Sequence, residues 1–246
     1  MIPYLGCKEK WAKYFLSLVP AAENFYDLFG GGGSVTEAAF KIQENGMFGH
    51  WKKWRNVHYN EINKGVYELN KAIWNGDFNF DYAKKEWITK ERYFAERRQP
   101  TAWGAFISFF WSFGNKDESY IYSERRLAAK CQDHLKNIRR AERSPFLPEI
   151  KLTNKDYREV HIKKQSVVYC DIPYNINRNH YKVRFDHNAF YKWAISVPFP
   201  IYFSDYNIPP EFSAWFAEIW NKEIYVRIHL GIKRTERVFW NRKKLN

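Results

Sequence analysis

The stretch "DLFGGGGSVTEAA", from Asp27 to Ala39, joins an aromatic run to an apolar helical pattern through four consecutive glycines. Before it, Asn24 to Phe29 ("NFYDLF") has the alternating character of a strand, and after it Ser34 to Gln43 has the apolar spacing of a helix. We expect that helix to close at Asn45-Gly46. The order strand, glycine turn, helix is typical of an α/β unit.

A second unit of the same kind follows directly. "NVHYNEIN" predicts a short strand at Val57 to Tyr59 and a polar turn, and a helix then runs from about Lys64 to Trp74 and ends at Asn75-Gly76. Two such units in succession predict a parallel sheet.

The last third of the chain returns to strands. "SVVYCDIPY" predicts a buried strand at Val167 to Cys170, a helix follows near Asn188 to Ile195, and "PIYFS" after Pro200 predicts another strand. Further strand candidates lie at Glu218 to Trp220, Tyr225 to His229 and Val238 to Trp240. Their short connections favour late antiparallel pairs.

Between these regions, from about Asp81 to Arg143, charged helical stretches alternate with the aromatic run "WGAFISFFWSFGN". We expect an inserted, mainly helical subdomain over residues 81–146. Residues 1–80 and 147–246 then form one discontinuous domain.

The composition points toward a polyanionic partner. The 246 residues include 40 Lys and Arg against 27 Asp and Glu, and the formal net charge of +13 attracts nucleic acid. Aromatic residues make up 20% of the chain and are mixed among the basic ones, which suits stacking on bases. A basic enzyme with an aromatic-rich core explains the same composition equally well.

The cysteines and the apolar stretches exclude other classes. Cys7, Cys131 and Cys170 are scattered without C-x-x-C spacing, so neither a disulfide framework nor a zinc site is predicted. The most apolar stretch, Ala102 to Phe113, is shorter than the roughly 18–20 residues of a membrane span. We expect a cytoplasmic protein, a monomer or weak dimer, with no metal and no membrane partner.

The glycines of the first unit leave two alternatives open. A phosphate loop of the Walker type is excluded, because Ser34-Val35-Thr36 follow directly and no lysine does. The contiguous glycines favour either close approach of a nucleoside-like ligand or a merely tight turn. Glu61, after the second strand, is either an acceptor for ribose hydroxyls or an ordinary acid at a helix N-terminus.

The strongest chemical signal is "CDIPYN", Cys170 to Asn175, in which an aspartate emerges from a buried strand into a Pro-Tyr turn. It resembles the Asp-Pro-Pro-Tyr motif of amino-methylating DNA methyltransferases. "PYLGCK" (3–8), "DLFGGGGSV" (27–35) and "YNEIN" (59–63) resemble their cofactor, glycine-rich and acidic motifs. The order, with a long insert before the last motif, resembles that of Dam-like DNA adenine N6-methyltransferases of the D12 class.

The resemblance is to phage-type members, and it extends over nearly the whole chain through "SFGNKDESYIY" (112–122), "FDHNAFYKWA" (185–194) and "TERVF" (235–239). It implies a Rossmann-like S-adenosylmethionine-dependent methyltransferase fold, with the insert as target-recognition subdomain. It also implies methyl transfer from S-adenosylmethionine to N6 of an adenine flipped out of double-stranded DNA, in a bacterial or phage-infected cell.

The resemblance assigns roles to single residues. Asp171 and the Ile172 carbonyl would accept the hydrogens of the target amino group, Pro173 would restrain the turn, and Tyr174 would stack on the flipped base. The cofactor would contact Tyr4, Gly6, Lys8, Asp27, Phe29, Gly30, Gly31, Gly32, Gly33, Ser34, Glu61, Asp156 and Tyr157. DNA would contact Asn115, Lys116, Arg125, Arg126, Lys130, Arg139, Arg140, Arg178 and Lys182.

Two departures from the family pattern keep alternatives open. Ile172 stands where the family usually has proline, and Cys7 stands where it commonly has glycine. A DNA-binding homologue that has lost catalysis would show such changes first. A methyltransferase acting on RNA or on cytosine N4 would use a similar Asp-x-Pro-Tyr turn.

Overall fold

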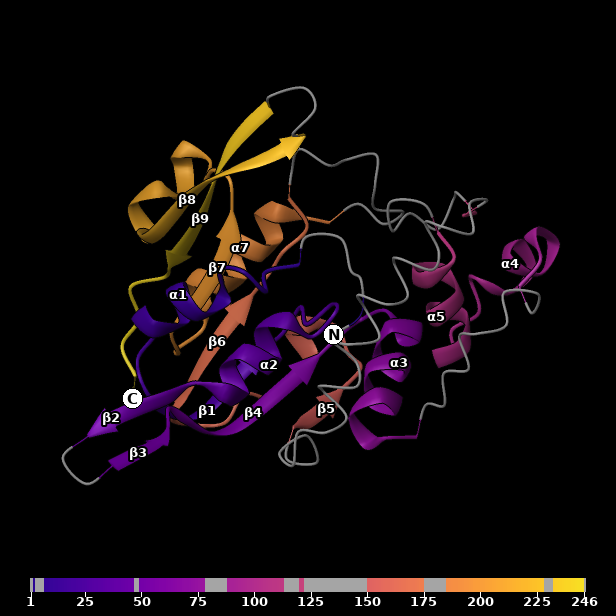
Figure 1. The fold of residues 1–246 in the computed structure, drawn as a ribbon. Coiled ribbons are helices and arrows are strands. Elements are labelled where there is room, and N and C mark those ends of the chain that lie inside the picture. The colour runs from indigo at the N-terminus through magenta and orange to yellow at the C-terminus, as the bar shows by residue number, and fades with distance from the viewer. Residues whose placement is uncertain are drawn as a thin grey trace.

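A computed structural model describes residues 2, 7–46, 49–77, 88–112, 120–121, 150–174, 185–227 and 232–245. Its centre is a seven-stranded sheet in the order β5-β4-β1-β6-β7-β9-β8 (Figure 1). These strands are β1 (Ala22–Asp27), β4 (Trp54–Asn60), β5 (Lys151–Thr153), β6 (Ser166–Cys170), β7 (Ile201–Asp205), β8 (Ala217–Arg227) and β9 (Ile232–Trp240).

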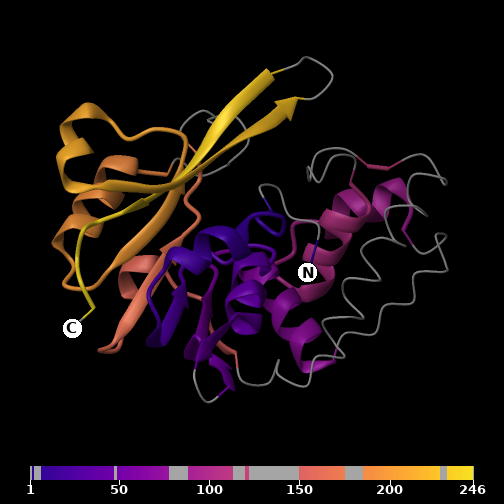
Figure 2. The ribbon, with the colours of Figure 1, turned by 60° about the vertical axis from the view of Figure 1, so that its left-hand side comes forward.

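The pairing confirms the predicted sheet. The neighbours β5-β4-β1-β6-β7 are all parallel, whereas β9 pairs antiparallel with both β7 and β8. A parallel sheet with helices between its strands and a late antiparallel pair is the expected Rossmann-like arrangement. Figure 2 shows the β8–β9 pair extending beyond the rest of the sheet.

Helices lie on both faces of the sheet (Figure 1). They are α1 (Ala12–Leu18), α2 (Ser34–Lys41), α3 (Lys64–Asn75), α4 (Lys90–Glu96), α5 (Ala102–Phe110) and α7 (His187–Ser196), with short 3-10 turns at η4 (Tyr157–Glu159) and η6 (Pro210–Trp215). None of these helices is long and apolar enough to cross a membrane.

Side chains alternate between the two faces of the sheet along each strand, and this divides the hydrophobic core into two clusters. In β1, Phe25 belongs to the cluster shared with α1, α2, α3 and α5, and its neighbour Tyr26 belongs to the cluster shared with α7. Tyr169 and Cys170 of β6 divide in the same way, because successive side chains of a strand point to opposite faces. Each face is therefore sealed by its own helices.

The second predicted helix begins and ends where the sequence predicts, because residues at both ends form caps. The Asn63 side chain accepts a hydrogen bond from the Val66 amide at 3.3 Å and caps the first turn of α3. Gly76, at φ +73°, takes the left-handed conformation that ends it. The predicted helix from Lys64 to an Asn-Gly end is confirmed.

The first predicted helix is too long. Instead of continuing to Gln43, α2 ends at Lys41, and Ile42 is extended at ψ 134°. Strand β2 (Gln43–Gly46) then pairs antiparallel with β3 (Gly49–Lys52). Pairing with the next segment satisfies backbone groups that a longer helix would have used, so the Asn45-Gly46 pair lies in a hairpin strand and not at a helix end.

The late strands differ in length from the prediction. The candidates at Glu218 to Trp220 and from Tyr225 onward belong to one strand, β8, which has register shifts at Glu218/Trp220 and Tyr225/Arg227. Those irregularities interrupt the alternation that sequence reading depends on. The antiparallel pairing with β9 is as expected.

The beginning of the predicted insert packs on the main domain. In α5, Phe106 and Phe110 join the core cluster that also holds Val66 and Leu69 of α3. Residues 113–119 and 122–149 lie outside the described residues, so the division at 81–146 stays a prediction. An antiparallel bridge joins Ser112 to Tyr120.

Candidate active site

The parallel strands bring their carboxyl ends, and four acids, to one edge of the sheet. Asp27 ends β1, Glu61 follows β4, Asp171 follows β6 and Asp205 ends β7. Asp27 aligns with Tyr59 on one side and with Tyr169 on the other. This edge is where ligands of open α/β sheets bind.

The glycine turn, residues 28–33, packs against the aromatic side chains of Tyr59 and Trp74. A Cβ on Gly30 would lie 2.1 Å from Cε2 of Tyr59, so no larger residue fits there. Gly33 has φ +81° and its Cβ would lie 2.6 Å from Trp74. The Tyr59 hydroxyl and the Asn70 amide each donate to the Gly31 carbonyl at 2.8 Å. The turn is therefore a rigid, tightly packed structure.

Glu61 joins the acidic motif to this turn. Its carboxylate accepts hydrogen bonds from the Gly31 amide at 2.8 Å and from the Asn63 amide at 2.7 Å. Burial raises the pKa of Glu61, and these amides lower it in part. Each carboxylate oxygen has two lone pairs, so Glu61 retains acceptor capacity for a ligand hydroxyl.

Asp27 is a buried carboxylate with one oxygen satisfied. Its Oδ2 accepts from the Thr36 hydroxyl at 2.7 Å, while Oδ1 has no hydrogen-bond partner among the described residues. Burial raises the pKa of Asp27 to about 7, and the charges of Asp171 and Glu61 contribute to the rise. A buried acceptor of this kind fits a ligand that brings a cation or a hydrogen-bond donor.

Beside it lies a group that we name the Lys8 cluster: Lys8, Asp171, Tyr174 and Glu236. The buried Lys8 ammonium lies 2.9 Å from Oδ1 of Asp171 and 3.1 Å from Oε1 of Glu236. The Tyr174 hydroxyl donates to Glu236 and lies 3.5 Å from Asp171. The cluster joins the N-terminal segment, the loop after β6 and strand β9.

The charges in the cluster shift the pKa values of Lys8 and Asp171. Burial lowers the pKa of Lys8, but Asp171 and Glu236 raise it by more, so the ammonium stays protonated. Burial raises the pKa of Asp171, Lys8 lowers it and Glu236 raises it again, to about 6. At neutral pH Asp171 is therefore mainly ionised and able to accept hydrogen bonds.

Aromatic and cationic groups pack around Tyr174. The Lys8 ammonium lies 5.0 Å from the centroid of its ring, and the ring of Tyr206 lies at 4.4 Å. Arg234 lies 5.4 Å from the centroid of the Tyr206 ring. Tyr174 is thus held by both its hydroxyl and its ring.

Two residues of α7 without an assigned role make hydrogen bonds at this edge of the sheet, one to the loop after β6 and one to the end of β7. Nε2 of His187 lies 2.6 Å from the Pro173 carbonyl oxygen, and Tyr191 donates to Asp205 at 2.8 Å. Ile172 is 2% exposed and packs in the core cluster on the α7 face of the sheet. The side chain that replaces the usual proline therefore fills the core.

The remaining predicted cofactor residues differ in their surroundings. Asp156 accepts two hydrogen bonds from the Arg158 guanidinium, at 2.8 and 2.9 Å, and caps η4. Tyr157 is buried among aromatic rings that include Phe29 at 5.2 Å. The Lys8 amide donates to the Ser34 hydroxyl at 3.2 Å, which places the N-terminal segment against the start of α2.

Several predicted residues lie outside the described residues. They are Tyr4 and Gly6 of the cofactor set and the whole DNA set, Asn115, Lys116, Arg125, Arg126, Lys130, Arg139, Arg140, Arg178 and Lys182.

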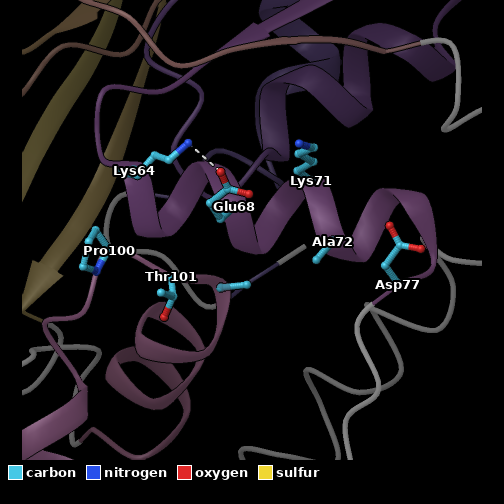
Figure 3. Close-up of a pocket in the computed structure, with 8 residues that line it drawn as sticks. Lys64, Glu68, Lys71, Ala72, Asp77, Pro100 and Thr101 are labelled. Atoms are coloured by element: carbon cyan, nitrogen blue, oxygen red, sulfur yellow. Dashed lines mark ion pairs between the residues drawn. The ribbon is translucent and has the colours of Figure 1, made fainter.

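A separate pocket of about 470 Å³ lies between α3 and the start of α5. Figure 3 shows Lys64, Glu68, Lys71 and Asp77 along one side and Pro100 and Thr101 on the other, with an ion pair between Lys64 and Glu68. No residue of the predicted site lines it.

The model of the D12 class N6 adenine-specific DNA methyltransferase family matches residues 4–195, which is most of the chain. The chain belongs to this family. The match includes the glycine turn, Glu61, Asp171 and Tyr174, and it confirms the resemblance drawn from the motifs. S-adenosylmethionine is accordingly the methyl donor of the family to which this methyltransferase belongs.

No curated protein matches the chain. Solved structures similar to this methyltransferase include the M. jannaschii tRNA m1G37 methyltransferase, at 10% identity and a TM-score of 0.41, over 95% of this chain and 48% of that one. A dimethyladenosine transferase from Plasmodium falciparum has 8% identity and a TM-score of 0.40, over 98% and 62% of the two chains. This chain spans about half the length of the M. jannaschii enzyme.

Proposed function

We propose that this protein methylates N6 of adenine in double-stranded DNA, with Asp171 and the Ile172 carbonyl as acceptors for the target amino group. The observation that carries the proposal is the buried Lys8 cluster, which holds an ionised Asp171 directly after β6, beside the glycine turn. Family membership supplies the reaction class.

The chemistry needs an acceptor of this kind. The lone pair of an adenine amino group is delocalised into the ring, so two acceptors on its hydrogens localise the pair and aim it. When bound, S-adenosylmethionine would supply a methyl group on a cationic sulfur, which would keep the electron pair of the broken S–C bond. The nitrogen lone pair forms the new N–C bond, and the surplus proton on nitrogen passes to Asp171.

The residues in and beside the glycine turn suit the groups that the donor carries. We assign Asp27, whose Oδ1 has no hydrogen-bond partner among the described residues, to the donor's ammonium group, and Glu61 to its ribose hydroxyls. The rigid backbone from Gly30 to Gly33 allows close approach because it carries no side chains. Asp156, paired with Arg158, and the buried Tyr157 would bound the adenine end of this site.

The flipped adenine would lie against Tyr174, because base flipping brings the reacting amino group within reach of Asp171. The basic side chains outside the described residues, among them Arg125, Arg126 and Arg178, would contact DNA phosphates. The intact Lys8 cluster favours an active enzyme over a homologue that has lost catalysis. A monomer or weak dimer in the cytoplasm remains part of the proposal.

The test is to incubate the protein with double-stranded DNA and labelled S-adenosylmethionine and to identify the modified nucleoside. We expect N6-methyladenine, and we expect Asp171→Asn to lose at least a hundredfold in rate, since one acceptor becomes a donor. Binding of DNA should persist in this variant. Glu23→Gln, an exposed change in β1, is the control. Label on cytosine, or an active Asp171→Asn protein, would contradict the proposal.

A further inference from the structure

Glu236 is a buried acid in the Lys8 cluster. It is not required to neutralise the Lys8 ammonium. Its side chain is 6% exposed, and that of Lys8 is 4% exposed. Asp171, at 2.9 Å, already neutralises the Lys8 ammonium. Burying a second carboxylate is costly, and it leaves Lys8, Asp171 and Glu236 with a net charge of −1 in a poorly hydrated site.

This excess charge lies where the proposed reaction places a cation. Asp171 holds the target nitrogen by a hydrogen bond, and a reacting methyl group lies about 3–3.5 Å from that nitrogen. The donor's sulfur is then roughly 7 Å from the Asp171 carboxylate by the same distances. At that separation opposite charges in a partly buried site attract strongly compared with thermal energy.

The donor and the product differ in this one charge. S-adenosylmethionine carries a sulfonium cation, whereas S-adenosylhomocysteine carries a neutral thioether, and apart from the transferred methyl group the two are otherwise identical. A site of net charge −1 therefore favours the donor and weakens its hold on the product once the methyl group has left.

We propose that Glu236 is a positioning residue that keeps the Lys8 cluster at net charge −1, so that the site prefers the cationic donor to the neutral product. The inference rests on the proposed function. Glu236 also accepts the hydrogen bond of the Tyr174 hydroxyl, and so it orients the ring proposed to meet the base.

Other charges near the cluster do not replace Glu236. Asp27 lies close enough to Asp171 that both acids raise the pKa of Cys170. The pKa of Asp27 itself is about 7, so this acid is partly protonated at neutral pH. Burial and the neighbouring acids raise the pKa of Tyr174 well above its ordinary value, so this phenol is neutral. Arg234 is next to Tyr206 and brings positive charge.

The experiment measures dissociation constants of S-adenosylmethionine and S-adenosylhomocysteine by calorimetry at neutral pH, for the full chain and three variants. Glu236→Gln removes the charge and keeps the size, and Glu236→Asp keeps the charge. Glu223→Gln removes an exposed charge from the same strand pair and is the matched control. We expect the preference for the donor over the product to fall about tenfold in Glu236→Gln, and to persist in the other two.

A purely structural role would weaken both ligands equally and leave their ratio unchanged. An unchanged ratio in Glu236→Gln therefore overturns the inference, and so does loss of the preference in Glu236→Asp, which serves as the test if the glutamine variant does not fold. Failure of the unmodified protein to bind either ligand or to methylate DNA would contradict the proposed function instead.

Discussion

The glycine turn and the Lys8 cluster each place a carboxylate at the same edge of the sheet, the buried Asp27 and the partly buried Asp171, but their charges have different surroundings. Asp27 beside the turn has an oxygen without a partner among the described residues, and its pKa rises to about 7. Asp171 in the cluster lies 2.9 Å from the Lys8 ammonium, and its pKa is about 6 despite the nearby Glu236. The nearby Lys8 ammonium keeps Asp171 able to accept hydrogen bonds, whereas burial without such a close cation among the described residues favours the protonated form of Asp27.

The largest expected effect comes from removing that counter-charge. In Lys8→Met, the buried Glu236 and the partly buried Asp171 lose their cation, so we expect at least a hundredfold loss of methylation and a loss of about 3–5 kcal/mol in the free energy of unfolding. Single-turnover kinetics and urea denaturation measure the two effects. Lys10→Met, an exposed change two residues away, is the control. Full activity and stability in Lys8→Met would remove the distinction between the two acids.

A smaller effect concerns pH. Because the reaction needs ionised Asp171, we expect the single-turnover rate to fall about tenfold for each pH unit below about 6 and to level off above it. Glu236 raises the pKa of Asp171, so Glu236→Gln should move this midpoint to lower pH. The rate profile of Glu223→Gln should match that of the unmodified protein. A midpoint near the ordinary aspartate value in the unmodified protein would contradict the burial argument.

The smallest effect is on stability. The pKa of Asp27 rises from 3.8 to about 7 on folding, so the folded state binds more protons and its stability falls as pH rises between those values. Asp27→Asn retains an acceptor for Thr36 and carries no charge. We expect its melting temperature to be a few degrees higher at neutral pH, with weaker binding of S-adenosylmethionine.

Thermal unfolding measured at pH 4 and at pH 7 checks this prediction, because most of the gain should disappear at pH 4, which lies well below the folded pKa of about 7 and close to the unfolded value of 3.8. Glu23→Gln, exposed in the same strand, should show no gain. A gain of equal size at both pH values would mean that the charge of Asp27 is not its cause.

The two regions also differ in how much of their structure could be predicted from the sequence. The strand, the glycines and the start of the helix follow one another in the chain, so all three were predictable from local pattern. Glu61 was predicted from its place after β4, although its hydrogen bond to the Gly31 amide was not. The hairpin of β2 and β3 was missed because pairing with a neighbour overrode a helical pattern.

The Lys8 cluster was predictable only in part. Lys8, Asp171 and Tyr174 belong to recognisable motifs, whereas Glu236 lies in "TERVF", a segment that pointed to the family without pointing to a role. His187, which contacts the Pro173 carbonyl, was missed for the same reason. Nothing local to either residue indicates its partner, which is 14 residues away for His187 and 62 for Glu236 with Tyr174.

By itself the sequence determined the order of the elements, the parallel sheet and the family, because hydrophobic period and turn chemistry are local properties of the chain. Only the tertiary structure decided which charges meet. Strand β9 returns beside β7, and this brings Glu236 to the ammonium of Lys8 and the hydroxyl of Tyr174. The charge of the site depends on contacts between segments that no local pattern connects.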